Sequence, residues 1–199
     1  MPDQTETLIL KAKKGDKVAF NRLVGEWYKR IYNFGFKYFS DHDQAMDITQ
    51  KTFIAVHKNL ERLDSPEKFK GWLYKIALNY CREEDRRQKK KWILPFVNFK
   101  KEREEFVFNA FESQLDNPEK SFQKGELADL LAKALSKLNA DQRAVIIMKE
   151  YECLKFKEIA EVLNISENTA KSRLYYGLKS LKAILSKWNI NKETINYEQ

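Results

Sequence analysis

Apolar residues recur at intervals of three and four along most of the chain, the spacing of one face of an α-helix. The first such segment covers residues 8–38 and is interrupted at Gly15 and Asp16, which predicts one or two helices with a break at this pair. Further helices are predicted over about 41–60 and 69–90. Beyond Glu126 the pattern sharpens again into four short helices. The expected fold class is all-α.

Between the two periodic parts the pattern decays, and Pro95 and Pro118 interrupt it. We therefore predict two small helical domains joined by a flexible linker. The predicted divisions are a first domain at 1–91, a linker at 92–125, a second domain at 126–188 and a C-terminal tail at 189–199. The run WILPFVNF at 92–99 is too apolar for a purely solvated linker, so we expect part of it to pack against another surface.

A helix-turn-helix is the most specific local pattern in the second part. FKEIAEVL (156–163) forms the expected first helix, Asn164 and Ile165 the turn, and Ser166 the cap of a second helix that is rich in basic residues. Such a helix fits the DNA major groove. The prediction buries Ala170, Leu174, Leu178 and Leu181, and it turns the following side chains outward or to the edges: Asn168, Lys171, Ser172, Arg173, Tyr175, Tyr176 and Lys179.

The predicted helix 69–90 is a second candidate for nucleic-acid binding. It interleaves Trp72, Tyr74 and Tyr80 with the cations Lys75, Arg82, Arg86 and Arg87. Cations neutralise phosphates and aromatic rings stack on unpaired bases. An ordinary solvated helix face explains the same residues equally well. On helix 41–60, the polar face with Asp47, Gln50, Lys51 and Ile54 is by itself typical of plain helix surface.

The charge balance favours a polyanionic partner. The 199 residues include 37 Lys and Arg against 29 Asp and Glu, a formal net charge of +8. An acidic protein or a membrane surface would satisfy that charge as well. No secretory signal and no membrane-spanning run is evident, so we expect a cytoplasmic protein without stable membrane insertion. Cys81 and Cys153 are interpreted as ordinary thiols.

Together these motifs resemble the extracytoplasmic-function (ECF) sigma factors of bacterial RNA polymerase, in the sigma-70 family. The stretches GDKVAFNRLV, DQAMDITQKTFIAVHKNL and FKGWLYKIALNYCREEDRRQKK resemble sigma region 2, and the segment from LSKLNADQRAV to YYGLKSL resembles region 4. The resemblance implies a transcription initiation factor that binds core polymerase, directs it to specific promoters and helps to melt promoter DNA. It also implies that an anti-sigma protein is a partner.

The resemblance assigns roles by position. The residues 168–179 given above fall on the helix that reads the minus-thirty-five element. The loop 62–70 matches the one that captures a flipped base of the minus-ten element. The minus-ten set is Ser65, Lys70, Lys75, Asn79, Arg82, Glu83, Arg86 and Arg87. The surface that docks on the clamp coiled coil of the largest polymerase subunit matches Asp47, Ile48, Thr49, Gln50 and Ile54.

The sequence departs from the family pattern in three places. Glu83, Glu84 and Asp85 stand together where the family tends to have one acid followed by an aromatic and an aliphatic residue, and such a cluster disfavours phosphate approach. Asn139 replaces a usual proline, and Tyr176 stands where arginine is frequent, which leaves base preference there open.

Two rival functions make different predictions. A conventional helix-turn-helix regulator would bind an operator as a dimer without polymerase. An enzyme such as a helical nuclease needs metal ligands or an activated nucleophile, yet His42 and His57 are the only histidines and no HExxH, P-loop or glycine-rich dinucleotide motif occurs. We therefore expect no catalytic residue, no metal and no cofactor.

Overall fold

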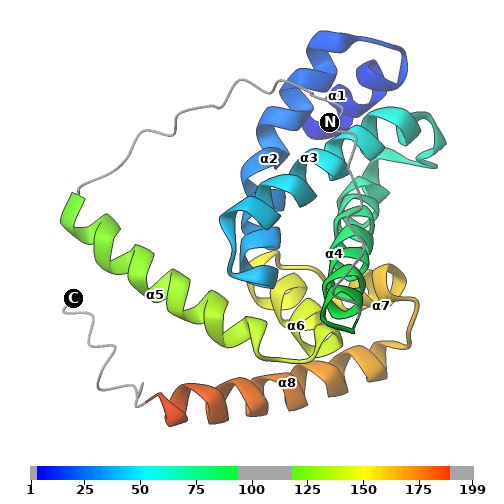
Figure 1. Ribbon diagram of the computed structural model, residues 1–199. Coiled ribbons are helices and arrows are strands. Elements are labelled where there is room, and N and C mark those ends of the chain that lie inside the picture. The colour runs from blue at the N-terminus through cyan, green and yellow to red at the C-terminus, as the bar shows by residue number, and fades with distance from the viewer. Residues whose placement is uncertain (1–3, 94–117, 189–199) are drawn as a thin grey trace.

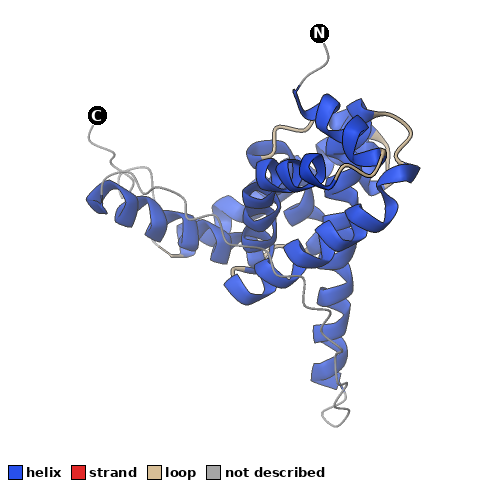
Figure 2. Cartoon of the chain, turned by 90° about the horizontal axis from the view of Figure 1, so that it is seen from above, coloured by secondary structure: helices blue, strands red, loops and turns tan. Residues whose placement is uncertain are grey.

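The computed structural model describes residues 4–93 and 118–188, with side chains described within 4–89 and 127–188. These residues form helices joined by short loops, without a strand among them, so the all-α prediction is confirmed (Figure 2). The helices are α1 (Gln4–Lys13), α2 (Lys17–Phe39), α3 (His42–Asn59), α4 (Phe69–Ile93), α5 (Pro118–Ser136), α6 (Ala140–Ile146), α7 (Phe156–Leu163) and α8 (Glu167–Lys187), with short helical turns η1 (Leu60–Arg62), η2 (Pro66–Lys68) and η3 (Ile147–Tyr151).

Helices α2 and α3 begin where the sequence places capping side chains. Gly15 has a φ of 88°, and the next residue, Asp16, accepts hydrogen bonds from the backbone nitrogens of Val18 at 2.9 Å and Ala19 at 3.0 Å. The predicted break at Gly15 and Asp16 is therefore confirmed. Asp41 caps α3 in the same way, accepting from the nitrogen of Gln44 at 2.8 Å, because the first amides of a helix have no partner within it.

Aromatic side chains dominate the core of the N-terminal half, residues 4–93. Trp27 of α2 packs edge-on against Phe69 of α4 with ring centroids 5.6 Å apart, and Phe34 lies 5.5 Å from Tyr74. At Gly35 a β-carbon would lie 3.1 Å from the Cα of Ala45, so the missing side chain lets α2 and α3 approach closely. This core fixes α3 and α4 beside each other.

The C-terminal half, residues 118–188, contains the helix-turn-helix and extends further toward the N-terminus than predicted. Helix α5 begins at Pro118, inside the segment assigned to the linker, whereas residues 94–117, most of that linker, lie outside the described residues. The tail 189–199 lies outside them too. Helix α8 packs on α6 through Gly177, whose β-carbon would stand 2.9 Å from Cδ1 of Ile146. Leu178, predicted to be buried, is 41% exposed, because Gly177 occupies the contact instead.

The two halves pack against each other and share one hydrophobic core (Figure 1). Helix α5 contacts α2, and α7 contacts α4. Tyr74 of α4 donates a hydrogen bond to the carboxylate of Glu152, which precedes α7. The interpretation of Tyr74 as a base-stacking residue is therefore wrong: its side chain is fully buried at this contact.

Candidate nucleic-acid and polymerase interfaces

The helix-turn-helix forms as the sequence predicts. Asn164 adopts a left-handed conformation with φ 54° and ends α7, and the nitrogen of Ile165 donates to the oxygen of Ala160 at 3.0 Å. Ser166 then caps α8, its Oγ accepting from the nitrogen of Thr169 at 3.0 Å. The turn and the cap together set the direction in which α8 leaves α7.

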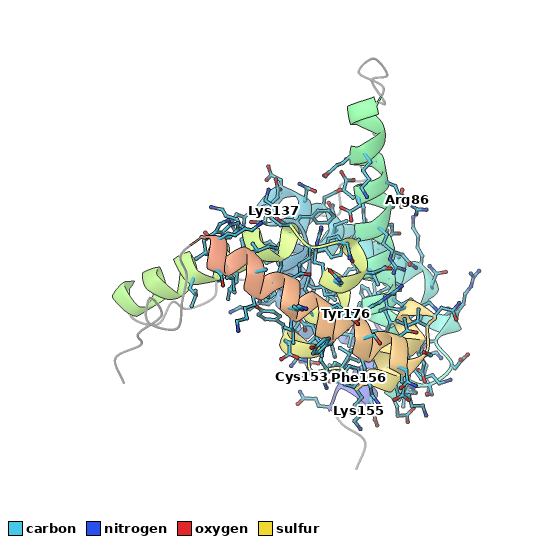
Figure 3. All side chains as sticks on the ribbon, turned by 90° about the horizontal axis from the view of Figure 1, so that it is seen from below. Arg86, Lys137, Cys153, Lys155, Phe156 and Tyr176 are labelled. Carbon is cyan, nitrogen blue, oxygen red and sulfur yellow. The ribbon has the colours of Figure 1, made fainter. Side chains whose placement is uncertain are left out.

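The outer face of α8 carries every residue of the predicted minus-thirty-five set. Tyr175 and Tyr176 are 67% and 58% exposed, and their rings meet edge to face at 5.4 Å. Figure 3 shows Tyr176 on this helix, away from the core. Only Arg173 is partly buried, because it is ion-paired with Asp141. The other exposed members are Asn168, Lys171, Ser172 and Lys179.

Between α6 and α8 the surface is hollowed. The hollow has a volume of about 660 Å³ and is lined by residues of both helices and of the turn before α6. Its lining includes amide, hydroxyl and cationic side chains, which are suited to contacting base edges or phosphates. The side chains that give it this character are Asn139, Asp141, Asn168, Ser172, Arg173 and Tyr176.

The second candidate surface is the outer face of α4. Lys75, Asn79, Glu83 and Arg86 are exposed along it. The C-terminal part of this helix projects from the rest of the molecule, and Arg86 lies on that part (Figure 3). Two members of the minus-ten set are engaged within the protein: Arg82 pairs with Asp141 at 3.1 Å and Arg87 with Glu84 at 2.6 Å.

The acidic cluster of α4 presents little negative charge to solvent. Glu84 is 7% exposed and accepts hydrogen bonds from Arg87, and that bond raises the pKa of the Arg87 guanidinium. Asp85 accepts the hydroxyl of buried Tyr38 at 2.9 Å. Of the three acids only Glu83 is exposed, so the departure from the family pattern leaves the basic face open to phosphates.

The loop 62–70 is attached to α1 and borders a second hollow. Lys13 Nζ donates to the oxygen of Leu63 at 2.6 Å. A hydrogen bond from Ser65 lowers the pKa of the neighbouring Glu67 carboxyl. The hollow, about 500 Å³, is lined by Thr5, Glu6, Glu26, Trp27, Arg30, Pro66, Glu67, Phe69 and Lys70. Of the predicted minus-ten residues on this loop, Lys70 lines the hollow, and Ser65 precedes Pro66, which also lines it.

Only some of the residues predicted to contact polymerase are accessible on the surface of helix α3. Asp47, Gln50 and Ile54 are half-buried on its outer side, and Asp47 pairs with Lys51 one turn later. Ile48 and Thr49 are 1% and 0% exposed, so their side chains belong to the core and cannot touch a partner. We correct the predicted surface accordingly.

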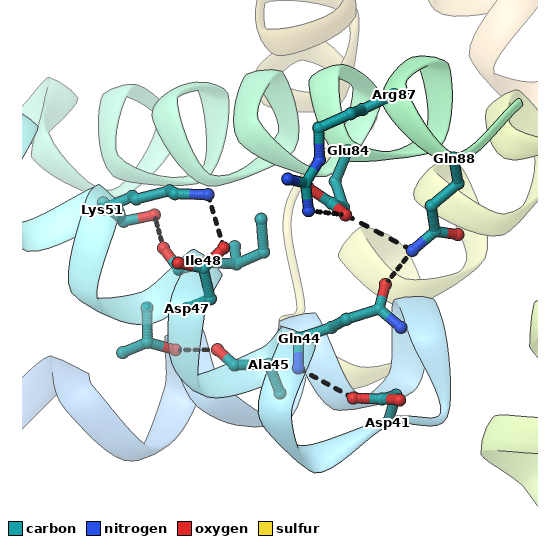
Figure 4. Close-up of polar contacts among 11 residues, drawn as sticks. Asp41, Gln44, Ala45, Asp47, Ile48, Lys51, Glu84, Arg87 and Gln88 are labelled. Atoms are coloured by element: carbon teal, nitrogen blue, oxygen red, sulfur yellow. Dashed lines mark hydrogen bonds and ion pairs between the residues drawn. The ribbon is translucent and has the colours of Figure 1, made fainter. Parts of the chain in front are cut away.

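A polar network beside this surface was missed by sequence reasoning. Gln88 of α4 donates to Gln44 of α3 at 2.6 Å and lies 3.5 Å from Glu84, which binds Arg87 (Figure 4). The network joins the first turns of α3 to the C-terminal part of α4. No sequence signal marks it, because glutamines on helix surfaces are ordinary.

The described residues contain no group of three or more His, Cys, Asp or Glu side chains placed to hold a metal ion. Within 4–93 and 118–188, no helix has both the length and the apolar character needed to cross a membrane. Both cysteines are free thiols, Cys81 buried and Cys153 exposed. The fold and its surfaces therefore define an all-α helix-turn-helix protein with a second basic helix in its other half.

Comparison with known proteins identifies the family. Residues 23–91 match the family model for sigma-70 region 2, and residues 128–181 match that for sigma-70 region 4. The ECF sigma factor SigW of Bacillus subtilis is 29% identical over 87% of this chain and 92% of its own length. The ECF sigma-E factor of Haemophilus influenzae is 27% identical over 85% and 89%. The chain belongs to the sigma-70 family, in its ECF branch.

Two solved structures share the fold. CnrH, in complex with the cytosolic domain of CnrY, has a TM-score of 0.68 at 22% identity, covering 93% of this chain and 99% of its own. The sigma factor RpoE of Bartonella quintana, in complex with the anti-sigma factor NepR, has a TM-score of 0.62 at 23% identity, covering 84% and 96%. Both similarities extend over both halves of the molecule.

Proposed function

We propose that this protein binds core RNA polymerase and directs it to specific promoters, reading a minus-thirty-five element with α8 and a minus-ten element with α4. One observation carries the proposal: a single chain exposes a capped recognition helix and a separate basic helix, each in the half that matches the corresponding sigma region. Two weak readings joined in one chain give a specificity that neither reaches alone.

For the minus-thirty-five element, amide and hydroxyl groups of Asn168 and Ser172 are suited to base edges. Lys171 and Lys179 are suited to phosphates, and the exposed rings of Tyr175 and Tyr176 to apolar groups such as thymine methyls. In this role, Arg173 has to exchange Asp141 for DNA.

For the minus-ten element, the projecting outer face of α4 offers Lys75, Asn79 and Arg86 to unpaired or melting DNA. The hollow beside loop 62–70 is a place for a base pulled out of the stack, with Lys70 and Arg30 near its phosphate and Trp27 at its wall. Melting assisted by base capture needs no covalent chemistry. The protein is accordingly proposed to be a binding factor rather than an enzyme, acting in the cytoplasm.

The polymerase contact is proposed to use Asp47, Gln50 and Ile54 of α3 against the clamp coiled coil of the largest subunit. An apolar side chain with polar neighbours matches the apolar centre and polar rim of protein interfaces. An anti-sigma protein is a further proposed partner, in keeping with the solved relative that is bound to NepR. The conventional-regulator alternative lacks an explanation for this surface.

The test is promoter-directed transcription by purified core polymerase with and without the protein, on promoters taken from genomic fragments that it enriches. We expect specific initiation with the parent protein and its loss in the double variant Asp47→Asn, Gln50→Ala. Glu161→Gln is the matched control, because it removes one exposed carboxylate from α7, in the other half of the molecule from the proposed surface. Operator binding with no effect on core polymerase would instead favour the conventional regulator.

A further inference from the structure

One carboxylate connects the two proposed DNA-binding surfaces. Asp141, in the first turn of α6, binds Arg82 of α4 through Oδ1 at 3.1 Å and Arg173 of α8 through Oδ2 at 2.8 Å. Arg82 belongs to the proposed minus-ten surface and Arg173 to the minus-thirty-five surface. All three side chains remain partly exposed, at 33%, 28% and 44% for Arg82, Arg173 and Asp141.

The Asp141 contact lies in an interface that holds the two halves together. Elsewhere in that interface Tyr74 binds Glu152, and Arg143 donates to the backbone oxygen of Tyr38 at 2.8 Å. A side chain at Gly71 of α4 would begin 3.9 Å from Cγ2 of Val162 in α7. Asp141 therefore lies where a closed arrangement of the halves brings both sets of DNA-binding arginines together.

Closed packing and promoter binding are mutually exclusive on geometric grounds. Elements named minus-ten and minus-thirty-five lie about 25 base pairs apart, which is roughly 85 Å along B-DNA at 3.4 Å per pair. Two arginines that share one carboxyl group cannot reach both. Arg82 has to leave Asp141 before each half can occupy its element.

We propose that Asp141 is an autoinhibitory counter-charge: in the free protein it pairs with both Arg82 and Arg173 and helps to hold the halves closed, and promoter phosphates replace it when the halves separate. This inference rests on the proposed function for its biological meaning. Because exposed ion pairs are individually weak, the closed state gains only about two- to fivefold in population from the Arg82 pair. This bias adds to the packing of the shared core, so polymerase and promoter binding together have to overcome both.

A disulfide measures the closed state directly. The parent for this test is Gly71→Cys, Val162→Cys, made with Cys153→Ser to remove the exposed native thiol. In the closed arrangement a β-carbon at position 71 lies 3.9 Å from Cγ2 of Val162, so the two introduced thiols are neighbours. We expect this parent to form the intramolecular disulfide under mild oxidation. At a urea concentration where the parent crosslinks at half its rate in buffer, closed and open halves are about equally populated, and we expect Asp141→Asn to slow crosslinking about 1.5- to threefold. Glu167→Gln is the control, since it removes an exposed carboxylate from α8 without bridging the halves, and it should leave the rate unchanged.

Two results would overturn the proposal: a parent that does not crosslink although circular dichroism shows it folded, or Asp141→Asn crosslinking as fast as the parent. The second arm is initiation by core polymerase, which we expect from the reduced parent and expect to fall more than tenfold in the oxidised one. Equal activity of both forms would also contradict autoinhibition. Each single-cysteine variant controls for oxidative damage. If the reduced parent does not initiate but Asp141→Asn still slows crosslinking, only the proposed function has failed.

Discussion

Arg143 of α6 donates a hydrogen bond to the backbone oxygen of Tyr38, 105 residues earlier, at a distance of 2.8 Å. The same guanidinium donates to the oxygens of Ser136 and Leu138 at 3.0 and 2.9 Å and lies 4.5 Å from the centre of the Tyr38 ring. Carbonyls at helix C-termini lack partners within the helix. One arginine thus satisfies the ends of α2 and α5, which belong to different halves of the molecule.

Replacing this arginine should destabilise the protein. Arg143→Met keeps much of the side-chain length but leaves three carbonyl oxygens without their donor, and we expect the free energy of unfolding to fall by about 2–4 kcal/mol. Urea unfolding followed by circular dichroism measures the change. Lys137→Met, at an exposed neighbouring position, should change it by less than about 0.5 kcal/mol. Similar values for the two variants would show that the guanidinium is not needed for packing.

Alkaline pH should destabilise the packed state through two tyrosines. Burial, assisted by Asp85, raises the pKa of Tyr38, and burial, assisted by Glu152, raises that of Tyr74. The folded protein therefore keeps protons that the unfolded chain releases above its usual tyrosine pKa of about 10. The stabilisation is complete below that pH and is lost as pH rises, by up to about 1.4 kcal/mol per pH unit for each tyrosine.

Phe variants separate the tyrosines from other titrating groups. Burial raises the pKa of the Cys81 thiol, which adds to the loss, and lowers that of Lys37, which opposes it. Comparing urea unfolding between pH 8 and 11, we expect a shallower decline for Tyr74→Phe than for the parent. Tyr175→Phe, an exposed control, should follow the parent. An unchanged slope in Tyr74→Phe would contradict the prediction.

Most of the helices could be predicted because their signals are local. Apolar spacing locates the buried faces of α2 and α3, and Asp16, Asp41 and Ser166 cap helices at the expected positions. Packing between the halves could not be predicted in this way. It depends on residues such as Tyr38 and Arg143, which are far apart in the sequence and have no shared pattern.

Some of the candidate sites could be predicted from the sequence and others could not, again because local patterns are visible in the sequence and tertiary contacts are not. The recognition face of α8 follows from helical spacing alone. On α3 the resemblance assigned Ile48 and Thr49 to a docking surface, whereas the structure buries both. They lie at helical spacing from the buried residues Ala45, Thr52 and Val56. The buried contact of Tyr74 and the pairing of Asp141 with two arginines required tertiary contacts that only the structure provides.

The cap of the recognition helix should contribute to the stability of the protein. Ser166→Ala removes the acceptor for the nitrogen of Thr169, and we expect a loss of about 1 kcal/mol in the free energy of unfolding. Ser166→Asp supplies another capping side chain and should recover most of it. Ser186→Ala, near the other end of α8, should have little effect. If Ser166→Ala is as stable as the parent, the cap is not contributing.

Salt dependence should distinguish phosphate contacts from base contacts on α8. Lys171 and Lys179 are exposed on its outer face, and each phosphate neutralised by a cation releases counterions, so the logarithm of affinity falls with the logarithm of salt concentration. We expect Lys171→Ala to weaken binding of every DNA sequence alike and to reduce the magnitude of that slope by about one. Fluorescence anisotropy with promoter and scrambled duplexes at several salt concentrations measures both quantities.

Ser172→Ala, next to Lys171 on α8, should change DNA binding in a different way. A serine hydroxyl that contacts a base edge reads sequence without adding charge. Its loss should therefore lower the ratio of the affinity for promoter DNA to the affinity for scrambled DNA, and leave the salt slope unchanged. Lys187→Ala, exposed at the far end of α8, is the charge control and should alter neither. If Lys187→Ala changes the slope as much as Lys171→Ala does, DNA is attracted by the net charge of the helix, and the proposed register of α8 in the groove is wrong.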